Sequence, residues 1–288
     1  MMAIFKLKER EKNRSILFSL WNTFSFRISI SLYLAVLLFW FIGSVINNRD
    51  PNYIHESSIL MPPGSDFVFG TDQIGRDQFS RLASAIPFAL LMSATGVLIG
   101  AIIGVILGVS AAYIGSWYER LVVVATNVLL GLPSLLLAIL VVGVLGTGRL
   151  KTVFAVSLIY IPEFARLGRL LTGHIKNSGF VVASRLMGFG RWWILRTHIL
   201  RNVLPSLVVL VAISLSTSLL AITALSFLGL GVVPPDTDLG NMLSLSLDFI
   251  SLAPWLVIAP SLILVLLVVA ANFLGDSLSR VLDSRQSG

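Results

Sequence analysis

Long apolar runs, separated by polar stretches, restrict what this sequence can fold into more than any other feature. A helix needs about 20 apolar residues to cross the hydrocarbon core of a bilayer. Six runs reach roughly that length, at residues 28–46, 85–114, 121–145, 152–171, 203–232 and 253–274. Hydrophobic residues make up 56% of the chain and charged residues 12%, against roughly half and a quarter in soluble proteins. The sequence therefore predicts an all-α membrane protein with about six transmembrane helices.

The charges of the connecting segments predict how these helices are oriented. Lys and Arg occur without any Asp or Glu between residues 164 and 202, whereas residues 231–249 contain three Asp and no Lys or Arg. Because basic loops tend to remain in the cytoplasm, we expect the first segment inside, the second outside and both termini in the cytoplasm. The turn that contains Arg149 and Lys151 runs against this rule.

The runs and loops divide the chain into five parts. We expect a cytoplasmic N-terminal arm, a first transmembrane helix, an extracytoplasmic loop, a five-helix core and a cytoplasmic tail, at 1–27, 28–46, 47–81, 82–275 and 276–288. Turn-forming stretches such as RDPN and MPPGSD predict the outer loop. Within the core, residues 172–202 are predicted as a long cytoplasmic loop.

A stripe of small residues marks the second run. Gly96, Gly100, Gly104 and Gly108 recur at every fourth position, and therefore lie on one face of a helix. Such a face lets another helix approach closely. The sequence leaves two partners open for it, another helix of the same bundle or a helix of a partner subunit.

The sequence lacks the motifs of several classes of active site. The phosphate-binding pattern GxxxxGK[ST], the zinc pattern HExxH and the esterase pattern GxSxG are all absent, and there is no Cys. The three His residues are scattered, so no metal site is expected. The net charge of +7 is attributed to cytoplasmic loops, and no nucleic-acid partner is expected. Few ionisable residues interrupt the runs, which disfavours an ion-coupled carrier.

Hydroxyl side chains cluster in the fifth run, in the stretch AISLSTSLLAIT at 212–223. Ser214, Thr217 and Ser218 share one side of the predicted helix. Two interpretations stay open: the hydroxyls bond to carbonyl groups of their own helix, or they line a hydrated path.

The segment FVVASRLMGFGRWWILRTHILRN, residues 180–202, contains four Arg and no acid. Its start is predicted to form one or two helical turns that end at Gly188 and Gly190. Apolar residues on two sides of these turns favour insertion into a protein groove over a position on the bilayer surface. The Arg residues could also bind anionic headgroups of the inner leaflet.

This segment resembles the EAA loop of the membrane subunits of bacterial ABC importers, at Val182, Ala183, Ser184, Gly188, Ile199 and Leu200. Further blocks, in the same order, resemble the second membrane subunit of the dipeptide, oligopeptide and nickel importers: FGTDQIGRDQFSRL, PEFARLGR, ALSFLGLGVVPPDTDLGNML, APWLVIAPS and NFLGDSLSRVLDSR. The first of them provides an outer-loop signature formed by Gly70, Thr71, Asp72, Gly75, Arg76 and Asp77.

The chain departs from the family's pattern at several positions. Val182 stands in place of the motif glutamate, Ser184 in place of an alanine and Arg201 in place of a proline. An acidic residue common in relatives is Ile222 here, and a tryptophan is Leu239. We therefore expect the loop to dock by shape and apolar contact, without the carboxylate that relatives can use.

The resemblance implies a type I ABC importer permease fold and a non-catalytic permease subunit in a bacterial inner membrane. The implied partners are a homologous permease subunit, two ATPase subunits that hold ATP and magnesium, and an extracytoplasmic binding protein, with no cofactor on this chain. ATPase docking is implied for Phe180, Val182, Ala183, Ser184, Arg185, Met187, Gly188, Ile199 and Leu200. A lining of the path is considered for Ser214, Thr217, Ser218 and Ile222.

The cargo implied by the resemblance is a di- or oligopeptide. Nickel, metallophore complexes and antimicrobial peptides are alternatives with the same architecture. A stand-alone ion-coupled carrier or channel is a hypothesis of another class, and a membrane-embedded enzyme lacks the necessary constellation of side chains.

Overall fold

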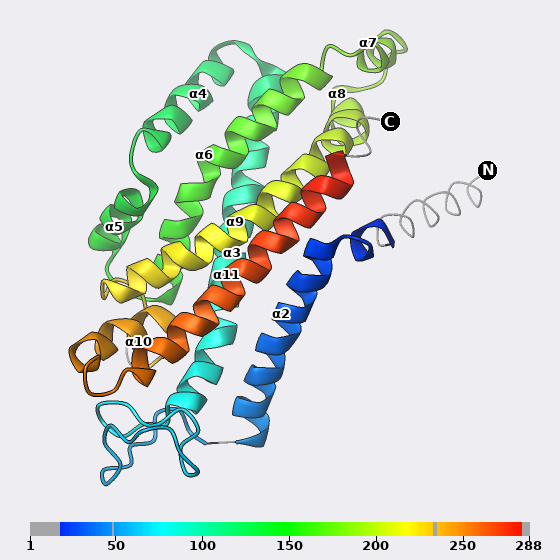
Figure 1. Cartoon of the computed structure of the whole chain (residues 1–288). Helices are drawn as coiled ribbons and strands as arrows, with labels where there is room; N and C mark the ends of the chain where they lie inside the picture. Colours follow the sequence, from blue (N-terminus) through cyan, green and yellow to red (C-terminus); the bar gives the residue numbers. More distant parts are fainter. Residues whose placement is uncertain (1–17, 48, 233–234, 284–288) are drawn as a thin grey trace.

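The computed structural model describes residues 18–47, 49–232 and 235–283, and every regular element within these ranges is a helix. Within these ranges, four helical segments have the length and hydropathy needed to cross a membrane. They are α2 (Phe24–Phe41) with the π-helical turn that follows it, α3 (Gln78–Ile114), the continuous run from α8 (Arg191–Ile194) to α9 (Arg201–Phe227), and α11 (Trp255–Asp283). Figure 1 shows them as a bundle of long, steeply inclined helices.

The third predicted span is not one straight helix. It consists of α4 (Ser116–Leu130) and α5 (Ser134–Leu145), which meet at an angle of 92° and can be counted together as a fifth span. Pro133 stands just before α5 with an extended ψ of 128°, and a proline disfavours the helical conformation at the residue before it. The GLP sequence at this break was therefore a signal that the long apolar run concealed.

The fourth predicted span is α6 (Arg149–Ile175). It is not among the helices that are apolar enough to be recognised as spans, since it contains Glu163, Arg166 and Arg169. It nevertheless lies along α3 inside the bundle (Figure 1).

Several boundaries differ from the predicted ones. Helix α3 begins at Gln78 rather than after residue 81, because the Asp77 carboxylate accepts a hydrogen bond from the Phe79 N–H (3.3 Å) and caps the helix. Helix α2 begins at Phe24, inside the predicted arm. Helix α6 continues to Ile175, and α11 continues through the predicted tail to Asp283. No proline interrupts the sequence after residue 275, so nothing local ends the helix there.

The four glycines of α3 form its contact with α6. A Cβ at Gly96 would lie 3.0 Å from the Val156 side chain, and one at Gly100 would lie 2.7 Å from the Tyr160 Cβ. A Cβ at Gly104 or Gly108 would overlap the carbonyl oxygen of a residue in α6. Of the two partners that the sequence left open, the structure places a helix of the same chain against this stripe.

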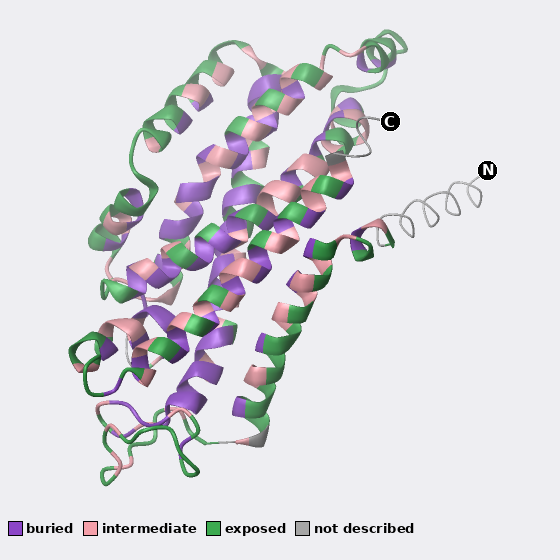
Figure 2. Cartoon of the chain, in the orientation of Figure 1, coloured by how far each residue is buried: buried purple, intermediate pink, exposed green. Residues whose placement is uncertain are grey.

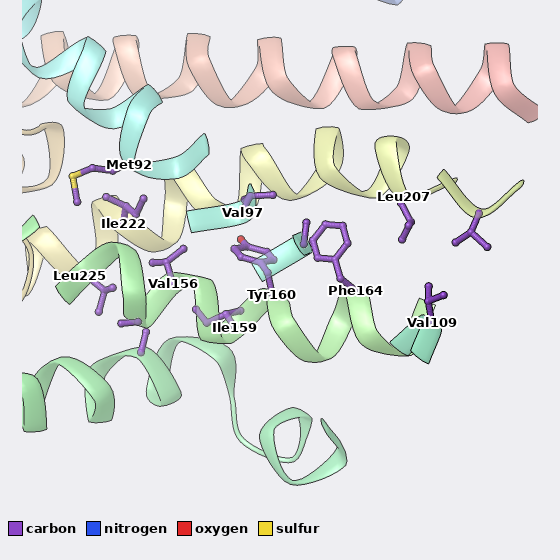
Figure 3. Packing of buried hydrophobic residues seen from close by; sticks show 14 of the residues in the cluster. Met92, Val97, Val109, Val156, Ile159, Tyr160, Phe164, Leu207, Ile222 and Leu225 are labelled. Carbon is purple, nitrogen blue, oxygen red and sulfur yellow. The ribbon is translucent and has the colours of Figure 1, made fainter. Parts of the chain in front are cut away.

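A hydrophobic core surrounds this contact. Tyr160 and Phe164 extend from α6 toward α9 and lie near Val97 and Leu207 (Figure 3). Helix α2 is attached differently, since only Ser25, Ser29 and Val36 of its residues are buried, as the exposed face in Figure 2 shows. The Ser29 hydroxyl donates a hydrogen bond to the Ala270 carbonyl of α11 (2.7 Å).

The two ends of the bundle carry different structures. Loop 49–77 lies at one end together with α10 (Leu239–Ser246), whereas α7 (Gly179–Leu186) lies at the other (Figure 1). The start of α2 and the end of α11 lie at the α7 end.

Candidate functional site

The segment that the sequence singled out for docking folds as α7, a turn, α8 and the π-helical stretch Leu195–Leu200, which continues into α9. Helix α7 ends where Gly188 adopts a left-handed conformation with φ +83°. The Gly188 N–H donates to the Arg185 carbonyl (3.1 Å), and the Phe189 N–H donates to the Ser184 carbonyl (3.2 Å). Glycine adopts this conformation at little steric cost, which explains why the helix ends there.

One face of α7 is buried against the rest of the segment. Val181 and Ser184 are buried, and the Ser184 hydroxyl donates to the Phe180 carbonyl (2.8 Å) and lies 3.0 Å from His198 Nε2. The His198 ring also contacts the rings of Phe180 and Trp193, with centroids 5.5 and 5.1 Å apart. These contacts fasten α7 to the start of the α9 run.

This arrangement divides the predicted docking set, which stays a prediction, into buried and exposed residues. Ser184 and Ile199 are buried within the chain, and Leu200 is partly buried. Ile199 belongs to the same buried cluster as Val181 of α7, and Ser184 lies against His198. The departure of Ser184 from the family's alanine has a local reason, because its hydroxyl makes the contact with His198.

The other face of α7 is exposed and apolar. Val182, Ala183, Leu186 and Met187 all project outward, with Leu186 83% exposed. Figure 2 shows the mostly exposed surface of this helix. Apolar side chains this exposed, on a helix outside the long spans, indicate a surface that a partner covers.

The outer-loop signature satisfies its own polar groups. The Asp72 carboxylate accepts hydrogen bonds from the N–H groups of Ile74 (3.0 Å) and Arg76 (2.9 Å) and from Arg76 Nε (2.7 Å). Arg81 Nε of α3 lies 3.6 Å from the same carboxylate. Asp72 and Arg81 are buried, so this ion pair joins the loop to the start of α3.

The remaining signature residues shape the same loop. Thr71 is buried, and its hydroxyl oxygen accepts a hydrogen bond from the Met61 N–H (2.9 Å). Gly70 and Gly75 have φ values of +71° and +84°. A Cβ at Gly70 would lie 2.7 Å from Trp255 Nε1 of α11. The signature therefore builds the attachment of the outer loop, and its side chains are turned inward.

The residues considered for the path are mostly interior. Ser214, Ser218 and Ile222 are buried, and the Ser218 hydroxyl donates to the Ser93 carbonyl of α3 (3.3 Å). Thr217 is exposed, with its hydroxyl 3.0 Å from the Tyr160 hydroxyl and donating to the Ser214 carbonyl (3.1 Å). Ser214, Ser218 and Ile222 thus pack α9 into the bundle within this chain, and their place along a path stays a prediction.

The basic residue that opposed the predicted orientation has partners of its own. Arg149 forms an ion pair with Asp236, and its guanidinium lies 4.0 Å from the centroid of the Phe88 ring. The Gly148 N–H also donates to the Gly231 carbonyl (3.1 Å). Sequence distance concealed this pairing, because Arg149 and Asp236 lie on different predicted loops.

Among the residues that the structure describes, no group of three or more His, Asp or Glu could hold a metal ion. Asp238 has a structural use instead, since its carboxylate accepts from the N–H groups of Gly240 (2.7 Å) and Asn241 (3.0 Å) and caps α10. Burial raises the pKa of Asp238, and these backbone hydrogen bonds oppose the increase.

A multi-pass helical body with an exposed apolar helix at one end defines a class of protein: a membrane component that works with other subunits. Residues 96–288 match the family described as binding-protein-dependent transport system inner membrane component. The chain belongs to this family.

Curated relatives match over most of their length. The di/tripeptide transport system permease protein DppC of Pseudomonas aeruginosa is 36% identical over 242 residues, which cover 82% of this chain and 80% of the relative. The glutathione transport system permease protein GsiD of Pectobacterium atrosepticum is 38% identical over 234 residues, which cover 81% and 78%.

The fold agrees with a solved importer. The inward-facing MetNI methionine ABC transporter matches with a TM-score of 0.58 and 22% identity, over 71% of this chain and 95% of the matched chain. At this identity the likeness concerns the fold alone. It confirms the predicted type I ABC importer permease fold.

The prediction of a permease subunit is confirmed by the family and the relatives. The chain is a non-catalytic, multi-pass membrane subunit of an ABC importer, and ATP hydrolysis belongs to a separate subunit. Membership also implies partners of three kinds: an ATPase, a binding protein and a second permease.

Proposed function

We propose that this chain forms half of the translocation path of a bacterial inner-membrane importer of short peptides, together with one homologous permease subunit. Two ATPase subunits, which hold ATP and magnesium, drive the cycle, and an extracytoplasmic binding protein delivers the cargo. Helix α7 inserts into a groove of one ATPase subunit. In this scheme both termini and α7 are cytoplasmic, as the acid-free segment 164–202 favours.

The observation that carries the docking proposal is the division of α7 into two faces. Val181 and Ser184 are held by the chain itself, whereas Val182, Leu186 and Met187 remain exposed. The inner face fixes the position of the helix, and the outer face offers apolar surface to a partner. A rigidly held helix can transmit movement of the ATPase subunits to the bundle, which is a rigid-body switch between two arrangements.

The absence of the motif glutamate suits this division. Val182 is 41% exposed on the outer face, so the chain presents an apolar side chain where relatives present a carboxylate. The free energy of binding to the ATPase then comes mainly from the burial of apolar surface, which contributes about 25 cal/mol per Å².

The peptide cargo rests on the relatives. One is named for di- and tripeptides and others for glutathione, which is itself a tripeptide. Identities of 36–38% over about four fifths of each chain support the same cargo class here.

Docking is tested by placing a charge on the outer face of α7. We expect Leu186→Asp to abolish co-purification of the ATPase subunits and ATP-dependent uptake, because a carboxylate cannot be buried in an apolar groove without a large penalty. Leu252→Asp is the matched control, since Leu252 is a 71% exposed leucine in the turn before α11. A normal ATPase yield with Leu186→Asp, or an equal loss with Leu252→Asp, contradicts docking by α7.

The cargo is tested separately in vesicles that contain the assembled importer and its binding protein. ATP-dependent uptake of labelled di- and tripeptides is expected, with no uptake of nickel ions. Nickel uptake without peptide uptake contradicts the peptide assignment and leaves the docking result unaffected. Uptake that persists without any ATPase subunit and stops with an ionophore shows an ion-coupled carrier instead.

A further inference from the structure

A cleft of about 620 Å³ lies between the C-terminal end of α3 and α8. Its walls include Tyr113 and Ile114 of α3, Arg185 of α7, and Arg191, Trp192 and Leu195 of the run that leads into α9. The Tyr113 hydroxyl donates to the Arg191 carbonyl (3.2 Å) and joins the two sides. Val182, Leu186 and Met187, the exposed apolar residues of α7, are not among the lining residues of this cleft.

The charge of the cleft is positive. Two arginines, Arg185 and Arg191, line it, and no Asp or Glu is among its lining residues. The Lys176 ammonium donates to the Ala112 carbonyl (2.8 Å) and lies at the same end of α3. Glu119, which follows α3 closely in sequence, is already paired with Arg169 (3.2 Å). The cleft therefore suits an anionic group.

Apart from Ser110 and Tyr113, the remaining lining residues are apolar. Ile114 is 66% exposed and Trp192 is 83% exposed, and Leu195 lies beside them in the lining. A free inorganic anion has no apolar part that could bury this surface. A ligand with a phosphate and a hydrocarbon chain satisfies both parts of the cleft.

The position of the cleft along α3 places it at headgroup depth. The 37 residues of α3 extend about 55 Å, which exceeds the ~30 Å hydrocarbon core of a bilayer. Its ends therefore reach the headgroup regions. Trp117 and Trp192 are both strongly exposed near this end, and Trp is enriched where membrane and water meet.

We propose that this cleft binds an anionic phospholipid, with its phosphate between Arg185 and Arg191 and an acyl chain along Ile114 and Trp192. Arg185 lies in the last turn of α7 and Arg191 opens α8, so the lipid connects the docking segment to α3. Anionic lipid then stabilises α7 in its docking position. Assignment to the inner leaflet rests on the orientation proposed above, whereas the cleft itself does not.

The test uses the assembled importer in lipid nanodiscs made of phosphatidylcholine with increasing phosphatidylglycerol. Native mass spectrometry counts retained phosphatidylglycerol, and ATPase activity is measured in parallel. Arg191→Gln is expected to lower the affinity for phosphatidylglycerol about fivefold, as about 1 kcal/mol per basic residue implies. The activation of ATPase activity by phosphatidylglycerol shifts to correspondingly higher lipid fractions.

Arg196→Gln is the matched control, because Arg196 is exposed in the same segment and does not line the cleft. We expect it to leave phosphatidylglycerol retention unchanged. An equal loss with both variants indicates diffuse attraction to a charged surface and overturns the proposal of a site.

A second variant separates a phospholipid from a free phosphate. Trp192→Ala removes apolar wall and is expected to weaken phosphatidylglycerol retention, while inorganic phosphate fails to displace the lipid from the native complex. Displacement by phosphate overturns the lipid assignment. So does a cross-link from a probe at position 192 to an ATPase subunit, which identifies a protein occupant.

Failure of the lipid site and failure of docking give different results. Retention of the ATPase subunits by a complex that binds no phosphatidylglycerol overturns the lipid site and leaves docking intact. Loss of the ATPase subunits in Leu186→Asp with phosphatidylglycerol still bound to the permease does the reverse.

Discussion

The family signatures at the two ends of the bundle differ in the exposure of their side chains. At the end formed by loop 49–77 and α10, Asp72 and Arg81 are buried and paired with groups of the same chain. At the α7 end, Val182, Leu186 and Met187 are exposed and apolar. Both segments resemble family signatures, yet one is closed on itself and the other remains open.

This difference separates two reasons for which a motif can exist. The outer signature holds a loop against the starts of α3 and α11, and its side chains have little left to offer a ligand. The α7 segment divides its residues, some for support from the chain and some for a partner. A motif match alone does not distinguish these uses, whereas burial and hydrogen bonds do.

The largest effect is expected from neutralising the buried carboxylate at the end formed by loop 49–77 and α10. Asp72→Asn keeps an acceptor for the N–H groups of Ile74 and Arg76 but removes the charge that faces Arg76 and Arg81. Loss of one partner of a buried ion pair costs about 3–5 kcal/mol. Thermal unfolding of the purified subunit in detergent measures the loss.

Asp50→Asn controls for the same chemical change, because Asp50 is exposed in the same loop and accepts from the Asn52 N–H (2.8 Å). It should leave the unfolding temperature almost unchanged. Equal stabilities of the Asp72 and Asp50 variants would contradict our view that the buried ion pair of Asp72 stabilises this end of the bundle.

A pair of glycine substitutions compares the two ends directly. Gly70 and Gly188 both have positive φ, so alanine at either costs about 1–2 kcal/mol of backbone strain. Of the two, only Gly70 is enclosed, since a Cβ there would lie 2.7 Å from Trp255 Nε1. At Gly188 nothing would lie within 4 Å of an added Cβ. We expect Gly70→Ala to lose a further ~1–3 kcal/mol through overpacking. Unfolding of the two variants is measured side by side. Equal losses of stability would contradict the expected difference between the two ends.

The smallest effect concerns the pH dependence of stability at the same end of the bundle, through Asp238. Burial raises the pKa of Asp238 above its unfolded value, so the folded protein binds more protons than the unfolded chain between these two pKa values. This contribution to stability is fully present below the unfolded pKa, near 4, and is lost as the pH rises through the folded pKa.

Asp238→Asn removes this titration and retains an acceptor for the cap of α10. Because Asn and Asp are comparable N-caps, we expect a difference within about 0.5 kcal/mol at low pH. The variant should then gain stability relative to the native chain as the pH rises. Unfolding temperatures of both chains, measured as the pH is raised from about 4, check the direction of this change. A gain in stability of the native chain relative to the variant would contradict it.

Hydropathy and the ordered family blocks predicted much of this molecule. Apolar runs predicted a helical membrane protein, and the family blocks predicted a permease of an ABC importer, as the comparisons confirm. The helix from Phe180 and its end at Gly188 were also predictable, because glycine permits the conformation that ends a helix. These features depend on the composition of one segment at a time.

Other features required contacts between segments. Nothing local in the glycine stripe of α3 specifies α6 as its partner, since any helix with a suitable surface can approach it. The break at Leu132 and Pro133 was hidden because its neighbours are as apolar as a continuous span. The pairing of Arg149 with Asp236 joins residues 87 positions apart (236 − 149).

The sequence by itself determined that this protein lies in a membrane, that it is helical and which family it belongs to. Hydropathy, turn residues and ordered motifs are properties of single segments, so they can be read without the tertiary structure. Only the tertiary structure decided which side chains face the chain and which face outward. Ser184 and Leu186 lie two positions apart on one helix, yet one is bound to His198 and the other is open. That distinction depends on which neighbouring surface covers a residue, and residue type alone does not specify that surface.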